Sequence, residues 1–390
     1  MCPMRNSLLN SSNLLFFYSS QSTGIGLRRC FILLTTACVF LVILSASLFR
    51  VNQNEPDKYK NPLNAAVTHI TRPSQSSQHM AQQTNMPSSK KPFIYLTQTG
   101  KCLPPNLASS AKIGDPETCK CDVIVLSYKT ECEDRNHPPH ISYIFDPTTT
   151  WASGRNLLFF NASKRATAYH YYIFIDDDVV LGFNSFTPPK MRTLQPFRVF
   201  EEWLLDYEPA FGFANYQRHG ARWTFKKREK LCGILEKFLV IPIVWFDGCL
   251  NAYHYQAVGH ILPYPTLDNG ESWYIPNKHI MSAVELTFRG QAMMLVPVGI
   301  FNIKHRVYPR RASAGEMAKY WLEFIEKIQE KAPLVYRNHS LWIKFKEGLG
   351  KHMDSSSTYC MNATRHLPII PFAHFDRKTS KVWNIETGFT

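Results

Sequence analysis

Three consecutive aspartates, Asp176–Asp178, form the group in this sequence with the clearest potential for chemistry. They directly follow the apolar run 171–175 (YYIFI), whose composition is typical of a buried strand. Adjacent carboxylates repel one another, so a hard divalent cation is the partner that best neutralises them. Because side chains alternate along an extended chain, Asp176 and Asp178 are expected on one side, where a cation could also hold a diphosphate. The alternative is a solvated acidic turn.

The elements around the aspartates predict an α/β domain with a mainly parallel sheet flanked by helices, because strand and helix patterns alternate. Strands are expected at 123–128, 141–145, 169–175, 240–246 and 291–298, and helices at 154–168, 197–207, 280–288 and 313–331. The first strand of the domain is either 93–96 or missing. Ligands of open α/β sheets bind at the carboxyl ends of the strands, which is where the aspartates would lie.

Further motifs flank the aspartates. Upstream, Gly154-Arg155-Asn156 lies at the start of a helix. Downstream come Asp268 and Glu271, then Arg289-Gly290 at the end of a helix, a strand through 294–297, and finally His305. This order resembles the GT-A class of nucleotide-sugar-dependent glycosyltransferases over roughly half of the chain, from about 121 to 310.

The resemblance implies roles for individual residues. Asp176 and Asp178 would hold Mn²⁺ or Mg²⁺, with His305 as a third ligand. Arg155, Asn156, Asp176 and Asp177 would bind the nucleotide-sugar donor. Glu271, or failing that Asp268, would be the catalytic base or contact the acceptor, a glycan or glycoprotein. The plainer alternatives are a helix-surface salt bridge for Arg155, an exposed loop carboxylate for Glu271 and a surface imidazole for His305.

The N-terminal part of the chain predicts a single membrane anchor. Residues 30–49 are twenty positions without a charge, enough for a helix of roughly 30 Å, and Arg28 and Arg29 precede them. The expected layout is a cytosolic tail at 1–29, a transmembrane signal-anchor at 30–49, a flexible stem at 50–91 and a luminal domain at 92–390, in the Golgi membrane with type II topology. The alternative is a cleaved signal peptide, which would give a cell-surface or secreted protein.

The cysteines and sequons are compatible with a luminal location. Seven cysteines follow the apolar segment, so in an oxidising compartment most would pair and one would remain. Zinc is disfavoured at Cys119-Lys-Cys121, because only one residue separates the two thiols. Sequons for N-glycosylation occur at Asn161, Asn338 and Asn362.

Composition excludes a disordered or fibrous chain, since 45% of the residues are hydrophobic and 19% are charged. A net charge of +14 favours anionic partners such as nucleotides or acidic glycans; no nucleic-acid partner is expected. Two alternatives to a glycosyltransferase stay open. One is a non-catalytic relative that binds glycans. The other is a sulfotransferase, which is disfavoured because no phosphate-binding Gly-rich loop is present.

Overall fold

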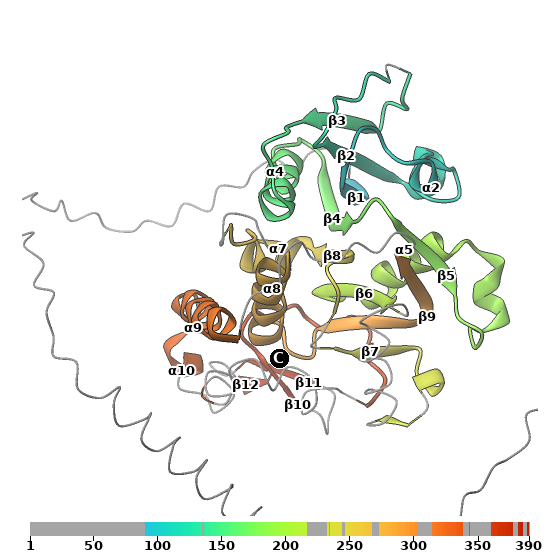
Figure 1. Cartoon of the computed structure of the whole chain (residues 1–390). Helices are drawn as coiled ribbons and strands as arrows, with labels where there is room; N and C mark the ends of the chain where they lie inside the picture. Colours follow the sequence, from blue (N-terminus) through green and yellow to red (C-terminus); the bar gives the residue numbers. More distant parts are fainter. Residues whose placement is uncertain are drawn as a thin grey trace, which may run out of the picture. The chain divides into compact units, whose positions relative to one another are not determined.

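The computed structural model describes residues 90–134, 136–216, 232–233, 235–243, 246–266, 273–302, 314–337, 343, 360–376, 381–384 and 388–389. The chain divides into two compact units, Met1–Gln82 and Gln83–Thr390, and all of these residues belong to the second. The main feature of this second unit is a nine-stranded sheet (Figure 1).

One half of the sheet is parallel. Strand β1 (Lys90–Thr99) lies between β2 (Cys121–Ser127) and β4 (Ala168–Ile175), and β3 (Ile141–Phe145) extends the sheet beyond β2. All seven residues of β2 are buried, as expected for a strand covered on both faces. The first strand is therefore present, and the carboxyl ends of β1, β2 and β4 share one edge.

The other half of the sheet is mostly antiparallel. Strand β8 (Leu250–His254) runs antiparallel to β4 and to β6 (Phe211–Tyr216). Strand β9 (Ala292–Asn302) pairs in parallel with β6 and antiparallel with β5 (Val179–Phe183) and β7 (Val240–Pro242).

The predicted mainly parallel sheet is therefore wrong. In the nine-stranded sheet of the described residues, four strand pairs are parallel and four are antiparallel, so this sheet is mixed. The sequence pattern missed this because β5, β6 and β8 are short, and their direction is set by tertiary partners.

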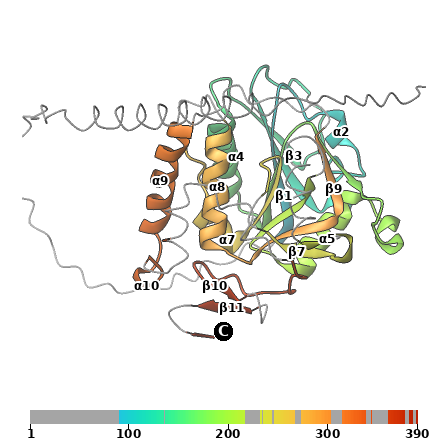
Figure 2. The ribbon, with the colours of Figure 1, turned by 60° about the horizontal axis from the view of Figure 1, so that its bottom comes forward.

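Helices cover both faces of the sheet. Figure 2 shows α4 (Trp151–Ser163), α8 (Tyr274–Thr287) and α9 (Ala314–Glu330) on one side and α5 (Pro196–Tyr207) on the other. Twelve of the fourteen residues of α8 are buried, since this helix lies between the sheet and α9. The other α-helices of the described residues are short: α2 (Pro105–Ala108), α3 (Pro116–Cys119), α7 (Tyr255–Ile261) and α10 (Leu334–Arg337).

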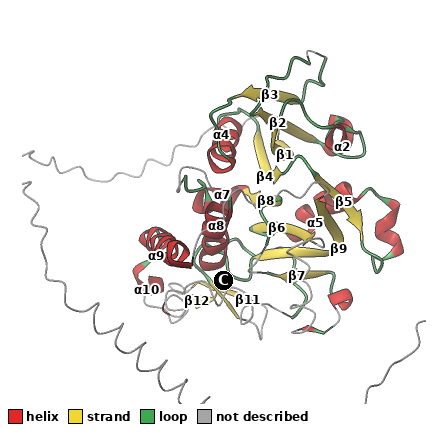
Figure 3. Cartoon of the chain, viewed as in Figure 1, coloured by secondary structure: helices red, strands yellow, loops and turns green. Residues whose placement is uncertain are grey.

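Helix α4 begins three residues before the predicted start. The Thr150 side chain accepts a hydrogen bond from the Ser153 amide, and the Ser153 hydroxyl accepts one from the Thr150 amide. This reciprocal cap fixes the helix start at Trp151 and directs Arg155 toward the end of β4. Figure 3 shows the helix beside the parallel half of the sheet.

The predicted membrane-spanning helix at 30–49 lies outside the described residues, as does nearly all of the predicted stem. Within the part of the chain that the structure describes, no helix is both long and apolar enough to cross a bilayer.

Three disulfides crosslink the described residues. They join Cys102 to Cys132, Cys119 to Cys121, and Cys232 to Cys360. The third ties the irregular segment that begins at 360 to the sheet region, where the Ala363 amide also donates to the Val240 carbonyl. Cys249 keeps a buried free thiol, so six of the seven cysteines beyond the apolar segment pair.

Candidate functional site

The three aspartates follow β4 and line a cavity of about 340 Å³ at the carboxyl-terminal edge of the parallel strands. Gln98 near the end of β1 and Tyr128 just after β2 lie in the same wall, so three adjacent parallel strands contribute. The described lining residues are Gln98, Tyr128, Lys129, Thr149, Thr150, Trp151, Asp176, Asp177, Asp178, Tyr216, Asp247, Gly248, Cys249, Trp273, Asn277 and Asn302.

The mixed sheet brings further groups to this edge. Because β8 runs antiparallel to β4, the segment 247–249 that leads into β8 arrives beside the end of β4. The Asp176 amide donates to the Cys249 carbonyl at 2.8 Å, which fixes this contact. Likewise, β9 runs antiparallel to β5, and its last residue, Asn302, pairs with Val179 next to Asp178.

Arg155 lies beneath the aspartates and is 2% exposed. Its Nη2 donates to Asp176 Oδ1 at 2.6 Å and to the Gly248 carbonyl at 2.8 Å, and its Nη1 donates to the Tyr264 hydroxyl at 3.2 Å. The guanidinium also stacks on Trp151, 4.1 Å from the ring centroid. Burial alone would lower the pKa of Arg155, but Tyr264 and Asp176 outweigh it and raise that pKa. Arg155 is therefore a fixed cation that orients Asp176.

Asp176 holds its proton more strongly than an ordinary aspartate does. Burial raises its pKa to about 7; Arg155 opposes this shift, while Asp178 and Asp247 add to it. The side chain is nevertheless 31% exposed, so the carboxyl group is recessed in the cavity rather than sealed off. A carboxylate among other carboxylates, open to a cavity, has the properties of a cation ligand.

The local charge fits a cation. Among the described lining residues there are four aspartates and one lysine. Asp176, Asp178 and Asp247 are close enough for the two others to raise the pKa of Asp176. Carboxylate oxygens are the ligands that Mg²⁺ and Mn²⁺ prefer. The residues present therefore fit a hard divalent ion.

Asn156 was predicted to bind the donor, but it is absent from the described cavity lining. Its Nδ2 donates to the Tyr264 carbonyl and its Oδ1 accepts from the Tyr264 amide, both at 2.8 Å. These paired bonds hold the segment carrying Tyr264 against α4, and the Tyr264 hydroxyl in turn contacts Arg155. Asn156 therefore positions Tyr264, which contacts Arg155. Direct contact of Asn156 with a donor stays a prediction.

Several predicted residues lie outside the described part of the chain: Asp268, Glu271, His305 and Asn338. Among the other sequons, Asn362 is exposed, and Asn161 is half-buried with its Nδ2 donating to the Leu157 carbonyl. The roles predicted for all of these residues stay predictions.

Sequence reasoning missed most of the cavity wall. Trp151, Trp273 and Tyr216 supply aromatic surface, and Asn277 and Asn302 supply amides. Asp247-Gly248 did carry a signal, since it follows the apolar run 240–246, but a turn explained it equally well. Its proximity to Asp176 depends on the antiparallel pairing of β8, which the sequence pattern did not show.

The pKa of Asp176 predicts how pH affects the stability of the metal-free protein. In the unfolded chain this carboxyl group ionises near its ordinary pKa of 3.8, whereas in the folded protein it keeps its proton until about pH 7. Its contribution to stability is therefore fully present below pH 3.8 and is lost as pH rises to about 7. Asp176→Asn mimics the protonated form, so it should gain stability relative to the unsubstituted protein as pH rises.

Urea unfolding of both proteins in the presence of a chelator, at about pH 5 and about pH 8, measures this difference. The stability difference between the two proteins should shift in favour of Asp176→Asn at the higher pH. A difference that is the same at both pH values would mean that Asp176 titrates normally.

The comparisons with known proteins add little to this geometry. No protein-family model matches the chain, and no curated protein matches it. One solved structure, described as the crystal structure of a mycobacterial protein, is similar to 61% of this chain and to 74% of its own, with 13% identity and a TM-score of 0.32. A likeness of that size bears on neither the fold nor the function of this chain.

Proposed function

We propose that this protein is a divalent-metal-dependent glycosyltransferase that moves a sugar from a nucleotide-sugar donor to a glycan or glycoprotein acceptor. The observation that carries the proposal is the convergence of Asp176, Asp178 and Asp247 on one cavity, with Arg155 fixed beneath them. The sequence motifs around these residues resemble those of the GT-A class, which supports the same function.

The negative charge of the cavity wall favours binding of the nucleotide-sugar donor through a metal ion. A nucleotide diphosphate is anionic, and four aspartates in the described lining would repel it if nothing intervened. A divalent ion removes the conflict because carboxylates and phosphate oxygens can bind the same ion. Asp176 and Asp178 are the residues we propose to hold Mn²⁺ or Mg²⁺.

The residues of the cavity orient a metal ligand and provide apolar surface for the donor. Arg155 restricts Asp176 through the bond to Oδ1, while the Asp176 side chain, 31% exposed, lines the cavity. Trp151, Trp273 and Tyr216 offer flat apolar surfaces on which a base or a sugar ring can pack. A bound divalent ion would stabilise the negative charge that develops on the departing nucleoside diphosphate.

An acceptor hydroxyl must lose a proton during transfer, and a carboxylate is the expected base if the reaction inverts the anomeric centre. Glu271 and Asp268 remain the candidates for this role, on the strength of the resemblance alone. The donor sugar and the acceptor are open parts of the proposal.

Calorimetry with the full-length protein tests the proposal. UDP, GDP and CMP are titrated separately, first with Mn²⁺ and then with a chelator. We expect at least one nucleotide to bind with Mn²⁺ and to lose that binding in chelator. If none binds under either condition, the proposed donor site is wrong.

A second measurement separates an enzyme from a non-catalytic glycan-binding protein. Nucleotide sugars are incubated with the protein and Mn²⁺, and release of the nucleoside diphosphate is followed. Slow hydrolysis that depends on Mn²⁺ is the expected result for a transferase whose acceptor is replaced by water. Nucleotide binding without any hydrolysis or transfer would instead favour the glycan-binding alternative.

A further inference from the structure

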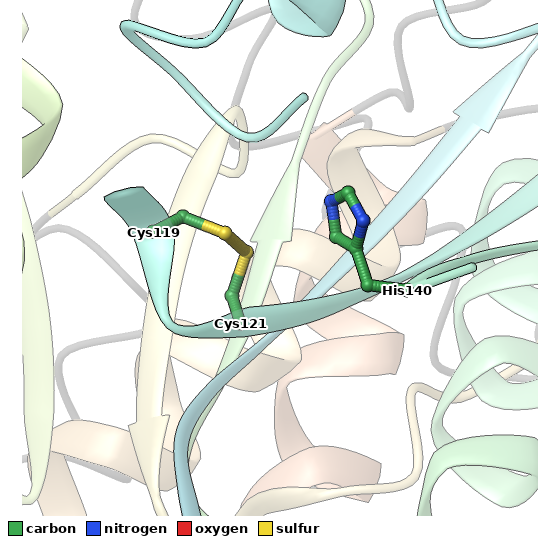
Figure 4. A group of neighbouring side chains, drawn as sticks. All are labelled: Cys119, Cys121 and His140. Atoms are coloured by element: carbon green, nitrogen blue, oxygen red, sulfur yellow. A yellow bond between two sulfur atoms is a disulfide. The ribbon is translucent and has the colours of Figure 1, made fainter. Parts of the chain in front are cut away.

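A second cluster of metal-ligand residues lies away from the cavity. Cys119 at the end of α3, Cys121 at the start of β2 and His140 just before β3 are all buried, with exposures of 1%, 0% and 5%. Figure 4 shows the three side chains as neighbours. One ligand atom from each residue lies within 4.8 Å of those from the other two.

The hydrogen bonds of His140 determine which of its ring nitrogens is available. Its Nε2 lies 2.9 Å from the Ile113 carbonyl oxygen, which can only accept, so Nε2 carries the proton. In the neutral ring, Nδ1 then holds a lone pair. This atom is buried and has no hydrogen-bond partner among the described residues. A buried acceptor without a partner is costly, and an imidazole held by a carbonyl on its other nitrogen is the usual arrangement of a metal-binding histidine.

We propose that Cys119, Cys121 and His140 form a binding site for a thiophilic divalent cation, Zn²⁺, when the Cys119–Cys121 disulfide is reduced. Zn–S bonds of about 2.3 Å and Zn–N bonds of about 2.0 Å separate the ligands of a tetrahedral site by roughly 3.5–3.8 Å. One ligand atom from each residue already lies within 4.8 Å of those from the other two, so with the disulfide broken only small side-chain movements are needed to reach that spacing.

The sequence spacing argued against zinc because one residue separates the cysteines. The backbone conformation at Lys120 nevertheless brings the two sulfurs together. Lys120 has a left-handed backbone (φ 49°), so the chain reverses between the two cysteines and both sulfurs reach the same point. His140 then comes from a distant part of the sequence, where it lies next to Ile141, the partner of Val123 in β2.

The chemistry balances with one co-reactant, a dithiol reductant. The dithiol gives two electrons and two protons, the S–S bond breaks to form two thiols, and the reductant becomes a disulfide. On binding Zn²⁺ both thiols release their protons, and the two thiolates and one ring nitrogen of His140 become ligands. Three protein ligands leave one position of the ion for a water molecule or a carbonyl oxygen. The disulfide and the metal site are therefore mutually exclusive states.

Either state links α3 to the start of β2, and the metal would add the residue that precedes β3. The cluster lies at the amino-terminal ends of these strands, whereas the cavity lies at the carboxyl-terminal ends, roughly 20 Å away along β2. The proposal is thus independent of the proposed function. Nucleotide binding can fail while this site holds, and the reverse.

The experiment uses full-length protein treated with a dithiol reductant and then freed of it without air. Co²⁺ is titrated first, because thiolate ligands give it an intense charge-transfer absorption; Zn²⁺ is then added to displace it. We expect one metal-binding event that involves Cys119 and Cys121. Alkylation followed by peptide mass spectrometry should show these two thiols protected by Zn²⁺. Oxidised protein should show neither effect at these residues.

Substitutions assign the ligands. His140→Gln keeps an N–H for the Ile113 carbonyl but removes the imidazole lone pair, so it should weaken Zn²⁺ binding at least about tenfold. The paired change Cys102→Ser and Cys132→Ser removes another disulfide and should leave the protection of Cys119 and Cys121 intact. If alkylation of Cys119 and Cys121 in the unsubstituted protein is unaffected by Zn²⁺, the site does not exist. That measurement needs no variant to fold.

Discussion

Asp178→Asn is expected to reduce Mn²⁺-dependent binding of a nucleoside diphosphate by at least about a hundredfold. Changes to residues that only orient a metal ligand cost about 10–100-fold, and this substitution removes a proposed ligand itself. The amide has nearly the same shape as the carboxylate but no negative charge, so the fold should survive at a site that is only 9% exposed. Calorimetry under the conditions that show binding for the unsubstituted protein measures the change.

Asp206→Asn is the matched control. This aspartate lies on the surface, 44% exposed, and pairs with Arg365; neither residue is among the described lining of the cavity. Its nucleotide affinity should equal that of the unsubstituted protein, and both variants should melt near the same temperature. Full binding by a folded Asp178→Asn variant would remove Asp178 from the proposed metal site.

Arg155→Met is expected to lower the free energy of unfolding by about 3 kcal/mol. The change leaves the Gly248 carbonyl without its donor, removes one of the two hydroxyl partners of Tyr264 and leaves Asp176 without its cation. Asp176 is partly exposed and can take up a proton, which keeps the cost at the low end for a broken buried pair. Urea unfolding at neutral pH measures the loss.

Two further variants show whether the ion pair is responsible. Arg365→Met breaks a surface pair, and its cost should stay below about 1 kcal/mol. In a double-mutant cycle, Arg155→Met should cost less when Asp176 is already Asn, because no carboxylate is then left unpaired. Equal costs for Arg155→Met and Arg365→Met would show that Arg155 does not hold the site together.

The parts of the site predicted correctly from the sequence are those encoded locally. Strand β4 was predicted from its apolar run, and the structure places the aspartates directly after it. The position of the aspartates could be predicted because it needed only the apolar pattern of the one strand before them. Arg155 was predicted to bind the donor from the resemblance alone. The structure buries it against Asp176 at 2.6 Å and outside the described cavity lining, so donor contact stays a prediction.

The parts that were missed depend on contacts between distant segments. Asp247 reaches Asp176 only because β8 runs antiparallel to β4; in a parallel arrangement the residues before β8 would lie at the opposite edge. Trp273, directly before α8, and Asn302, the last residue of β9, join the cavity from segments much later in the sequence. The lone pair of His140 likewise becomes visible only once the Ile113 carbonyl is placed.

The antiparallel entry of β8 also has a consequence for folding kinetics. Strands β1 to β4 can pair from a continuous stretch of sequence, but the cavity is complete only after β8 and β9, from much later in the chain, have been added. Such non-local pairing is slow to form, because a long loop must close before any contact compensates for the lost entropy. A metal ion that binds only the finished site would then act on the native state alone, slowing unfolding more than it speeds folding.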